Sequence, residues 1–119
     1  MSFAERRAFL RYKKTITVQL TDVEGVTYEA VTSDISLGGM CLSCPKSVVT
    51  KVLPNGIKTE PGDKVILDTQ LNTPNSEKIS LKGHVLGALR IAESDFYIRV
   101  SFVDLNQKQQ DSLQKLLNQ

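Results

Sequence analysis

The sequence contains few of the histidine, cysteine and aromatic residues that enzymes and nucleic-acid-binding barrels commonly use. It has one histidine, two cysteines and no tryptophan in 119 residues, and aromatic residues make up 6% of the chain. The single histidine, His84, has no evident acid–base partner, so the sequence predicts that the protein is not an enzyme. Barrels that bind single-stranded nucleic acid place several aromatic side chains on one face for base stacking. The low aromatic content therefore argues against that class.

Long apolar runs are also missing. No run approaches the roughly 18 residues that a membrane-spanning helix needs. Charged residues interrupt the N-terminus from Glu5 onward, so it lacks the apolar core of a secretion signal. We therefore expect a cytoplasmic protein whose cysteines are free thiols. The sequence has no repeat, low-complexity stretch or linker, and its 119 residues match the usual size of one domain.

Cys41 and Cys44 form a Cys-x-x-Cys pair, a spacing that raises the question of zinc or redox chemistry. One pair is only half of a structural zinc site, and no further ligands are evident. Residues three apart on a strand also point to opposite faces of the sheet. The sequence therefore predicts no metal and no cofactor, and we interpret the cysteines as core or surface residues.

Charge is unevenly distributed, although the net charge is only +2. Residues 1–14 hold five basic residues against one acidic residue, a net charge of +4, so the rest of the chain carries −2. A near-neutral body with a cationic N-terminal segment indicates a local anion site. It does not indicate a broad surface for nucleic acid.

Alternating apolar and polar residues predict a mostly β protein. From Lys14 to Leu20, Ile16, Val18 and Leu20 alternate with polar residues, which is the period of a half-buried strand. Residues 45–62 are expected to be mostly loop. Alternation of the same kind predicts strands at 27–33, 40–44, 63–71, 78–90 and 95–102, with a strand-like piece at 47–53.

The last part of the chain changes period. Four leucines from Leu105 to Leu117 are spaced for one face of a helix. Asn106 is a suitable N-cap, and Gln109 completes a pair that resembles a capping box. Six or seven short strands followed by one helix predict a small antiparallel barrel or sandwich, with the helix over one open end or face.

Two polar motifs are candidates for ligand binding. In the first, Arg7 and Arg11 are spaced Arg-x-x-x-Arg, and Arg6 directly precedes them. A guanidinium group binds phosphate through a planar fork, stacks on aromatic bases and can bond guanine at O6 and N7. A guanine nucleotide would use all three modes. The alternative is a solvated basic tail, which most such clusters are.

The second motif is Asp34–Gly39, which lies between two predicted strands. The Asp34 carboxylate accepts hydrogen bonds, and the Ser36 hydroxyl both donates and accepts them. Gly38 and Gly39 lack a Cβ atom, which lets another body approach the backbone closely. Taken alone, the motif is typical of an ordinary strand-to-strand connection.

Together the two motifs resemble the signature of PilZ domains, in which an Arg-x-x-x-Arg arm precedes the first strand and an Asp/Asn-x-Ser-x-x-Gly motif follows the second. The resemblance covers nearly the whole chain. It implies a bacterial receptor for cyclic di-GMP, without enzymatic activity, built on a six-stranded antiparallel β-barrel. The implied single domain consists of a flexible arm at 1–13, a barrel at 14–104 and a C-terminal helix at 105–119 that packs on the barrel.

The resemblance also implies a role for each motif residue. The arginines would contact phosphates and guanine edges or faces, while the aspartate and serine would bond a guanine base and neighbouring polar atoms. The glycines would permit close approach of the ligand. Arg6 occupies a position that influences ligand stoichiometry in the family, and here it favours an intercalated ligand dimer. The implied binding residues are Arg6, Arg7, Arg11, Asp34, Ser36, Gly38 and Gly39.

One residue departs from the family pattern. Many members have a glycine before the Val-x-Phe of the last strand, and this chain has Arg99 there. An Arg99 that points outward would be neutral or would add a cationic contact.

Ligand binding is expected to order the arm and to signal to an unidentified downstream protein. Two alternatives stay open at this point. One is a PilZ-like protein-interaction module that does not bind nucleotide, and the other is a small nucleic-acid-binding β-barrel.

Overall fold

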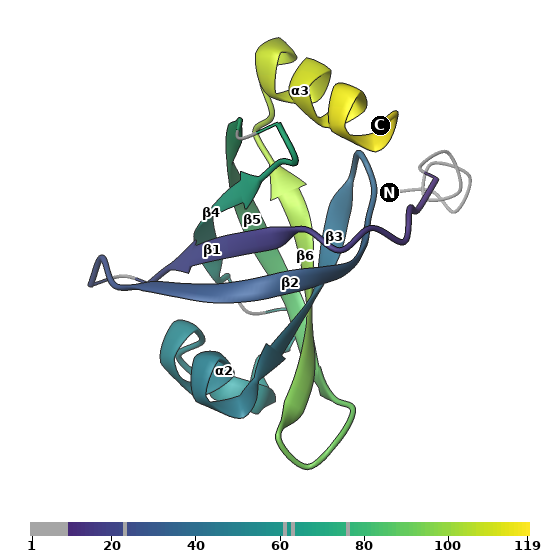
Figure 1. Ribbon diagram of the computed structural model, residues 1–119. Coiled ribbons are helices and arrows are strands. Elements are labelled where there is room, and N and C mark those ends of the chain that lie inside the picture. Colours follow the sequence, from purple (N-terminus) through teal and green to yellow (C-terminus); the bar gives the residue numbers. More distant parts are fainter. Residues whose placement is uncertain (1–9, 23, 61, 63, 76) are drawn as a thin grey trace.

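Six strands of alternating pattern close into one β-barrel (Figure 1). The computed structural model describes residues 10–22, 24–60, 62, 64–75 and 77–119. Neighbouring strands are antiparallel in the order β1-β2-β3-β6-β5-β4, and β4 pairs with β1 to close the barrel. The predicted six-stranded antiparallel barrel is therefore confirmed, and the sandwich alternative is wrong. The strands are β1 (Thr17–Thr21), β2 (Thr27–Ile35), β3 (Gly39–Pro45), β4 (Ile66–Asn72), β5 (Lys78–Arg90) and β6 (Asp95–Val103).

On each strand, the side chains that point inward are mostly apolar and fill the interior of the barrel. On β1, Val18 and Leu20 are fully buried, while the residues beside them are partly exposed. On β6, Phe96, Ile98 and Val100 are buried in the same way. Because the barrel is closed, each of the six strands pairs with a neighbouring strand on both sides.

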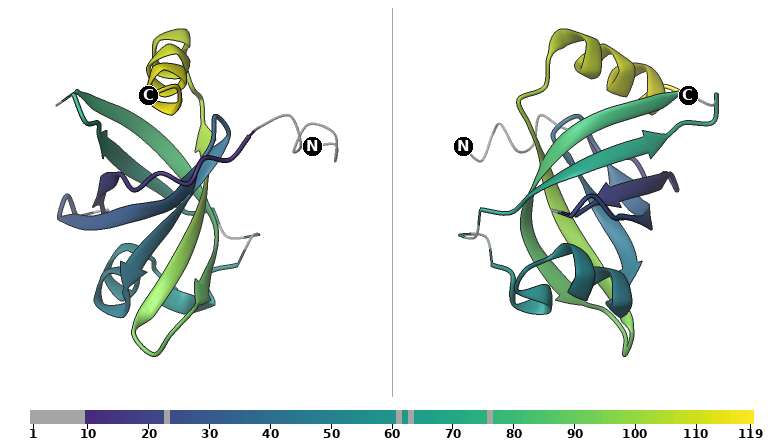
Figure 2. Two further views of the ribbon diagram at one scale, coloured as in Figure 1. Left: turned by 45° about the vertical axis from the view of Figure 1, so that its right-hand side comes forward. Right: turned by 90° about the vertical axis from the view of Figure 1, so that its left-hand side faces the viewer.

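A helix lies at each end of the barrel (Figures 1 and 2). At one end, α3 (Gln107–Leu117) begins after Asn106, whose side chain accepts a hydrogen bond from the backbone N–H of Gln109 at 2.8 Å. The Gln109 side chain accepts one from the backbone N–H of Asn106 at 2.8 Å. The predicted helix and its capping box are confirmed, and its buried leucines join the barrel core. Within the described ranges, no helix has the length and apolar character that a bilayer span requires.

The segment 47–53, predicted to be strand-like, is instead helical. It forms most of α2 (Lys46–Val52), which a 3-10 turn, η1 (Gly56–Lys58), follows. Four of the seven α2 residues are β-branched, and such residues favour strands. However, Val49 and Val52 are buried and belong to the barrel core. Their i, i+3 spacing puts them on one helical face, so burial at this end of the barrel outweighs the local preference.

A β-bulge in β2 decides which way the aspartate of the second motif points. The pairing of β2 with β3 shifts between Thr32 and Asp34, so Ser33 is an extra residue. Without the shift, the alternation that buries Ala30 and Thr32 would turn Asp34 toward the core. With the shift, Ile35 is fully buried and Asp34 lies on the outer surface.

The chain before β1 is held along β2. Tyr12 and Ile35 exchange two backbone hydrogen bonds, at 2.8 and 2.9 Å. The buried Thr32 hydroxyl accepts from the backbone N–H of Ile16 at 2.9 Å and donates to the carbonyl of Lys14. The Lys14 ammonium also donates to the carbonyl of Gln119, just after α3, at 2.6 Å. These bonds tie the segment to β2 and to the end of α3.

Candidate ligand-binding site

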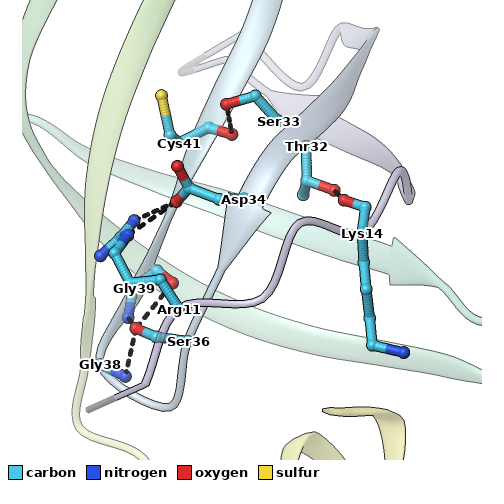
Figure 3. A network of polar contacts seen from close by, with 9 residues as sticks. All are labelled: Arg11, Lys14, Thr32, Ser33, Asp34, Ser36, Gly38, Gly39 and Cys41. Atoms are coloured by element: carbon cyan, nitrogen blue, oxygen red, sulfur yellow. Dashed lines mark hydrogen bonds and ion pairs between the residues drawn. The ribbon is translucent and has the colours of Figure 1, made fainter. Parts of the chain in front are cut away.

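The arm and the turn meet in an ion pair between Arg11 and Asp34 (Figure 3). Arg11 donates from Nε, at 2.8 Å, and from Nη2 to the same carboxylate oxygen, Oδ1. In the described part of the chain, nothing donates to Oδ2 of Asp34. The two side chains are 51% and 29% exposed. An ion pair this exposed contributes about 0–1 kcal/mol to the stability of the protein. Another partner can therefore replace the guanidinium or the carboxylate at little cost.

Local backbone geometry explains why these two side chains meet. Tyr12 pairs with Ile35, which points into the core. Neighbouring residues in extended chain point to opposite sides, so Arg11 and Asp34 both point outward. The β2 bulge and the backbone bridge of Tyr12 to Ile35 together bring the Arg11 and Asp34 side chains to the same side of the sheet.

Ser36 shapes the turn between β2 and β3 (Figure 3). Its hydroxyl accepts from the backbone N–H groups of Gly38 at 3.1 Å and Gly39 at 3.2 Å, and donates to the Gly39 carbonyl at 3.3 Å. The residue is 1% exposed. One donor and two lone pairs are the full capacity of a hydroxyl. The hydroxyl that was expected to bond a guanine base is thus fully engaged within the protein.

Gly39 and Gly38 hold the turn against β6. A Cβ atom on Gly39 would lie 2.2 Å from the carbonyl oxygen of Val100. The Gly38 carbonyl accepts a hydrogen bond from the backbone N–H of Phe102 at 3.0 Å. The close approach expected at Gly39 is made by the β6 backbone, so this glycine is needed for the barrel wall itself.

The turn borders a groove of about 750 Å³ between β6 and α3. This volume is within the range of about 300–1,000 Å³ that is common for small-molecule sites. The lining combines turn residues, the last part of β6 and one face of α3. It includes Arg11, Leu37, Gly38, Arg99, Phe102, Leu105, Gln110 and Asp111.

Arg99 is the groove residue whose role the sequence left open. It is exposed on β6, between Cys41 of β3 and Gly87 of β5. Gly87 takes this place because a second bulge shifts the pairing of β5 with β6 after Val85. A bulge of this kind leaves no clear signal in the sequence, so the position of Arg99 could only be recognised from the fold.

Both cysteines are free and buried. Cys44 belongs to the barrel core, whereas Cys41 pairs with the outward-facing Arg99. Burial raises the pKa of the Cys44 thiol to about 12, and the nearby Cys41 adds to the shift. Among the residues the structure describes, no group of three or more His, Cys, Asp or Glu side chains could hold a metal ion.

Two of the predicted site residues, Arg6 and Arg7, lie outside the described residues. The others come together around the β2–β3 turn (Figure 3), and they are Arg11, Asp34, Ser36, Gly38 and Gly39.

The chain is thus a small closed β-barrel domain in which an arginine of the arm meets a polar turn beside a groove. The family model described as the PilZ domain matches residues 5–119. The chain therefore belongs to the PilZ domain family, and the resemblance of the two motifs is confirmed at the level of the family.

Solved structures share this fold. The complex of K. pneumonia MrkH with c-di-GMP superposes with a TM-score of 0.75 at 21% identity, over 95% of this chain and 51% of that chain. The PilZ domain of YcgR from Escherichia coli with c-di-GMP gives 0.68 at 14% identity, over 95% and 89%. The inhibitor of motility MotI/DgrA from Bacillus subtilis gives 0.67 at 17% identity, over 95% and 50%.

At these identities the likeness shows the fold alone. The chain spans about half the length of the MotI/DgrA and MrkH chains. No curated protein sequence matches it.

Proposed function

We propose that this protein is a bacterial receptor for cyclic di-GMP that acts by binding and not by catalysis. The observation that carries the proposal is the Arg11–Asp34 ion pair, in which the two motifs, 23 positions apart, meet beside a groove of suitable size. Membership of the PilZ family supports the ligand, as do the c-di-GMP complexes of MrkH and of the YcgR PilZ domain.

The chemistry of the pair suits this ligand. Cyclic di-GMP carries two phosphate anions and two guanine bases. The Arg11 guanidinium binds a phosphate or the O6 and N7 atoms of guanine, and the Asp34 carboxylate accepts from guanine N–H groups. Exchange of the exposed ion pair costs about 0–1 kcal/mol, whereas a hydrogen bond to a charged group contributes about 1.5–3 kcal/mol. Ligand contacts therefore outweigh the pair that they replace.

The other motif residues have two kinds of role in this proposal. Ser36, Gly38 and Gly39 fix the turn against β6, so that its backbone forms the surface on which a base rests. Arg7 supplies the second guanidinium of the arm. Arg6 favours an intercalated ligand dimer, so calorimetry should give two nucleotides per protomer, and one per protomer would contradict this part.

Binding would draw the arm at 1–13 across the ligand on the barrel at 14–104, and would change a surface that a downstream cytoplasmic protein reads. The support comes from hydrogen bonds made by the residues just after Arg11 in the sequence. Tyr12 is bridged to β2, and Lys14 is bonded to the Gln119 carbonyl beyond α3. A movement of Arg11 is thereby linked to the helix at 105–119.

The test is the affinity of Arg11→Ala and Asp34→Ala for cyclic di-GMP by isothermal titration calorimetry. Each variant should lose about 2–4 kcal/mol of binding free energy, roughly 30- to 1000-fold. Both should stay folded, because the exposed pair adds little to stability. The control is Lys51→Ala, which removes a charge from α2 at the other end of the barrel (Figure 1). Affinity close to wild type in Arg11→Ala would contradict the proposal.

A further inference from the structure

We infer that the nucleotide site continues beyond the two motifs into the groove between β6 and α3, where Arg99 binds a phosphate and Asp111 binds the edge of a guanine base. This inference rests on the proposed function. It adds a charged contact and a source of base selectivity that come from this chain's own residues.

The first support is the electrostatic state of Arg99. In the described part of the chain, Arg11 is engaged with Asp34, while no carboxylate or carbonyl bonds the guanidinium of Arg99. Its neighbours across the barrel wall are Cys41 and Gly87, which are too small to cover it. A planar guanidinium binds two phosphate oxygens at once. Among the described residues, the Arg99 guanidinium therefore lines the groove without an anionic partner.

The second support is the set of polar α3 side chains that line the same groove as Arg99. Gln107, Gln110, Asp111 and Gln114 line the groove, and spacings of three and four residues put them on one side of the helix. The carboxylate Oδ1 of Asp111 accepts from Gln107 Nε2 at 2.9 Å. Within the described residues, nothing donates to Oδ2. Among the groove residues that the structure describes, Asp111 is thus the one acidic group, and it lies beside uncharged amides.

A carboxylate at this position discriminates between purines. Guanine presents two adjacent donors, N1–H and the 2-amino group, and a carboxylate only accepts hydrogen bonds. Adenine presents a donor beside an acceptor, which matches an amide better than a carboxylate. Asp111 would therefore favour guanine and disfavour adenine at this end of the groove.

The groove between Arg99 and Asp111 also suits a flat base. Leu37, Phe102 and Leu105 contribute to its lining, and all three pack against the barrel core. Such a surface can cover the face of a purine while its edge meets Asp111. The groove therefore offers apolar contact, a cation and an acceptor to the same ligand.

The test measures the affinities of Arg99→Ala, Arg99→Lys and Asp111→Asn for cyclic di-GMP and cyclic di-AMP by calorimetry. Arg99→Ala should weaken cyclic di-GMP binding by about 10- to 100-fold. Arg99→Lys should recover only part of this loss, because an ammonium group lacks the planar fork. Asp111→Asn should weaken the binding of cyclic di-GMP by about 10-fold. It should also reduce the ratio of the affinity for cyclic di-GMP to the affinity for cyclic di-AMP, since an amide can pair with adenine.

The controls separate this inference from the proposed function. Lys51→Ala matches the charge lost with Arg99, and Asp68→Asn matches Asp111 at an exposed position of β4. If the Arg99 and Asp111 variants bind within twofold of wild type while Arg11→Ala binds weakly, the inference is overturned and the proposed function stands. If the wild-type protein does not bind cyclic di-GMP, both are overturned.

Discussion

Gly39 and Gly83 lie on either side of Val100 and set how closely the strands approach. A Cβ on Gly39 would lie 2.2 Å from the Val100 carbonyl oxygen, and one on Gly83 would lie 2.2 Å from the Val100 Cγ1 atom. The first glycine lets the β6 backbone come near the turn. The second leaves room for a core side chain.

The Gly39→Ala variant should lose about 1–3 kcal/mol of unfolding free energy, since the added methyl group meets a backbone carbonyl that cannot move aside. Urea denaturation measures this loss. Gly87→Ala is the matched control, because the nearest atom to its Cβ is 3.8 Å away, an ordinary contact distance. Equal midpoints for the two variants would show that β6 does not need Gly39.

Cys44 should be unreactive in the folded protein. Burial raises its pKa from 9.0 to about 12, so the thiol stays protonated up to high pH in the fold but ionises near pH 9 in the unfolded chain. The contribution of this thiol to stability is therefore complete below pH 9 and is lost as the pH rises toward 12.

The measurement is alkylation by iodoacetamide in a Cys41→Ser variant, which leaves Cys44 as the single thiol. At pH 9 the native protein should react far more slowly than the same protein in urea. Similar rates in the two conditions would mean that the thiol is not protected by the barrel core.

Among the secondary-structure elements, periodicity located the strands and α3 because each buries one face. It failed at α2, where β-branched residues favour a strand but two buried valines at helical spacing pack against the barrel. It also could not locate the two bulges. A bulge is defined by pairing with another strand, and the residues of β2 and β5 alone do not show it.

Asn106 should be the main local determinant of where α3 begins. Asn106→Ala removes the acceptor for the Gln109 backbone N–H and should lower the unfolding free energy by about 0.5–2 kcal/mol. The Gln109 side chain also donates to the Ser80 carbonyl at 2.9 Å, which ties the helix start to β5. In thermal unfolding, the Asn106→Ala variant should have a lower midpoint than Lys108→Ala, which changes an exposed residue in the same turn. An unchanged midpoint would mean that leucine burial alone fixes the helix.

For the molecule as a whole, the end of the barrel beneath α3 carries the candidate site, and α2 closes the other end (Figures 1 and 2). The two motifs could be found in the sequence because each has a recognisable spacing. The groove could not, because it arises where α3 is laid over the barrel beside β6. Arg99 and Asp111 are therefore neighbours of the site only through the fold.

The most direct measurement is a calorimetric titration of the wild-type protein with cyclic di-GMP, with GTP and cyclic GMP as controls. A dianionic ligand with two guanine bases should bind saturably, and the two mononucleotides should bind far more weakly because each can occupy only part of the site. Absence of saturable binding by cyclic di-GMP, or equal binding of GTP, would contradict the account.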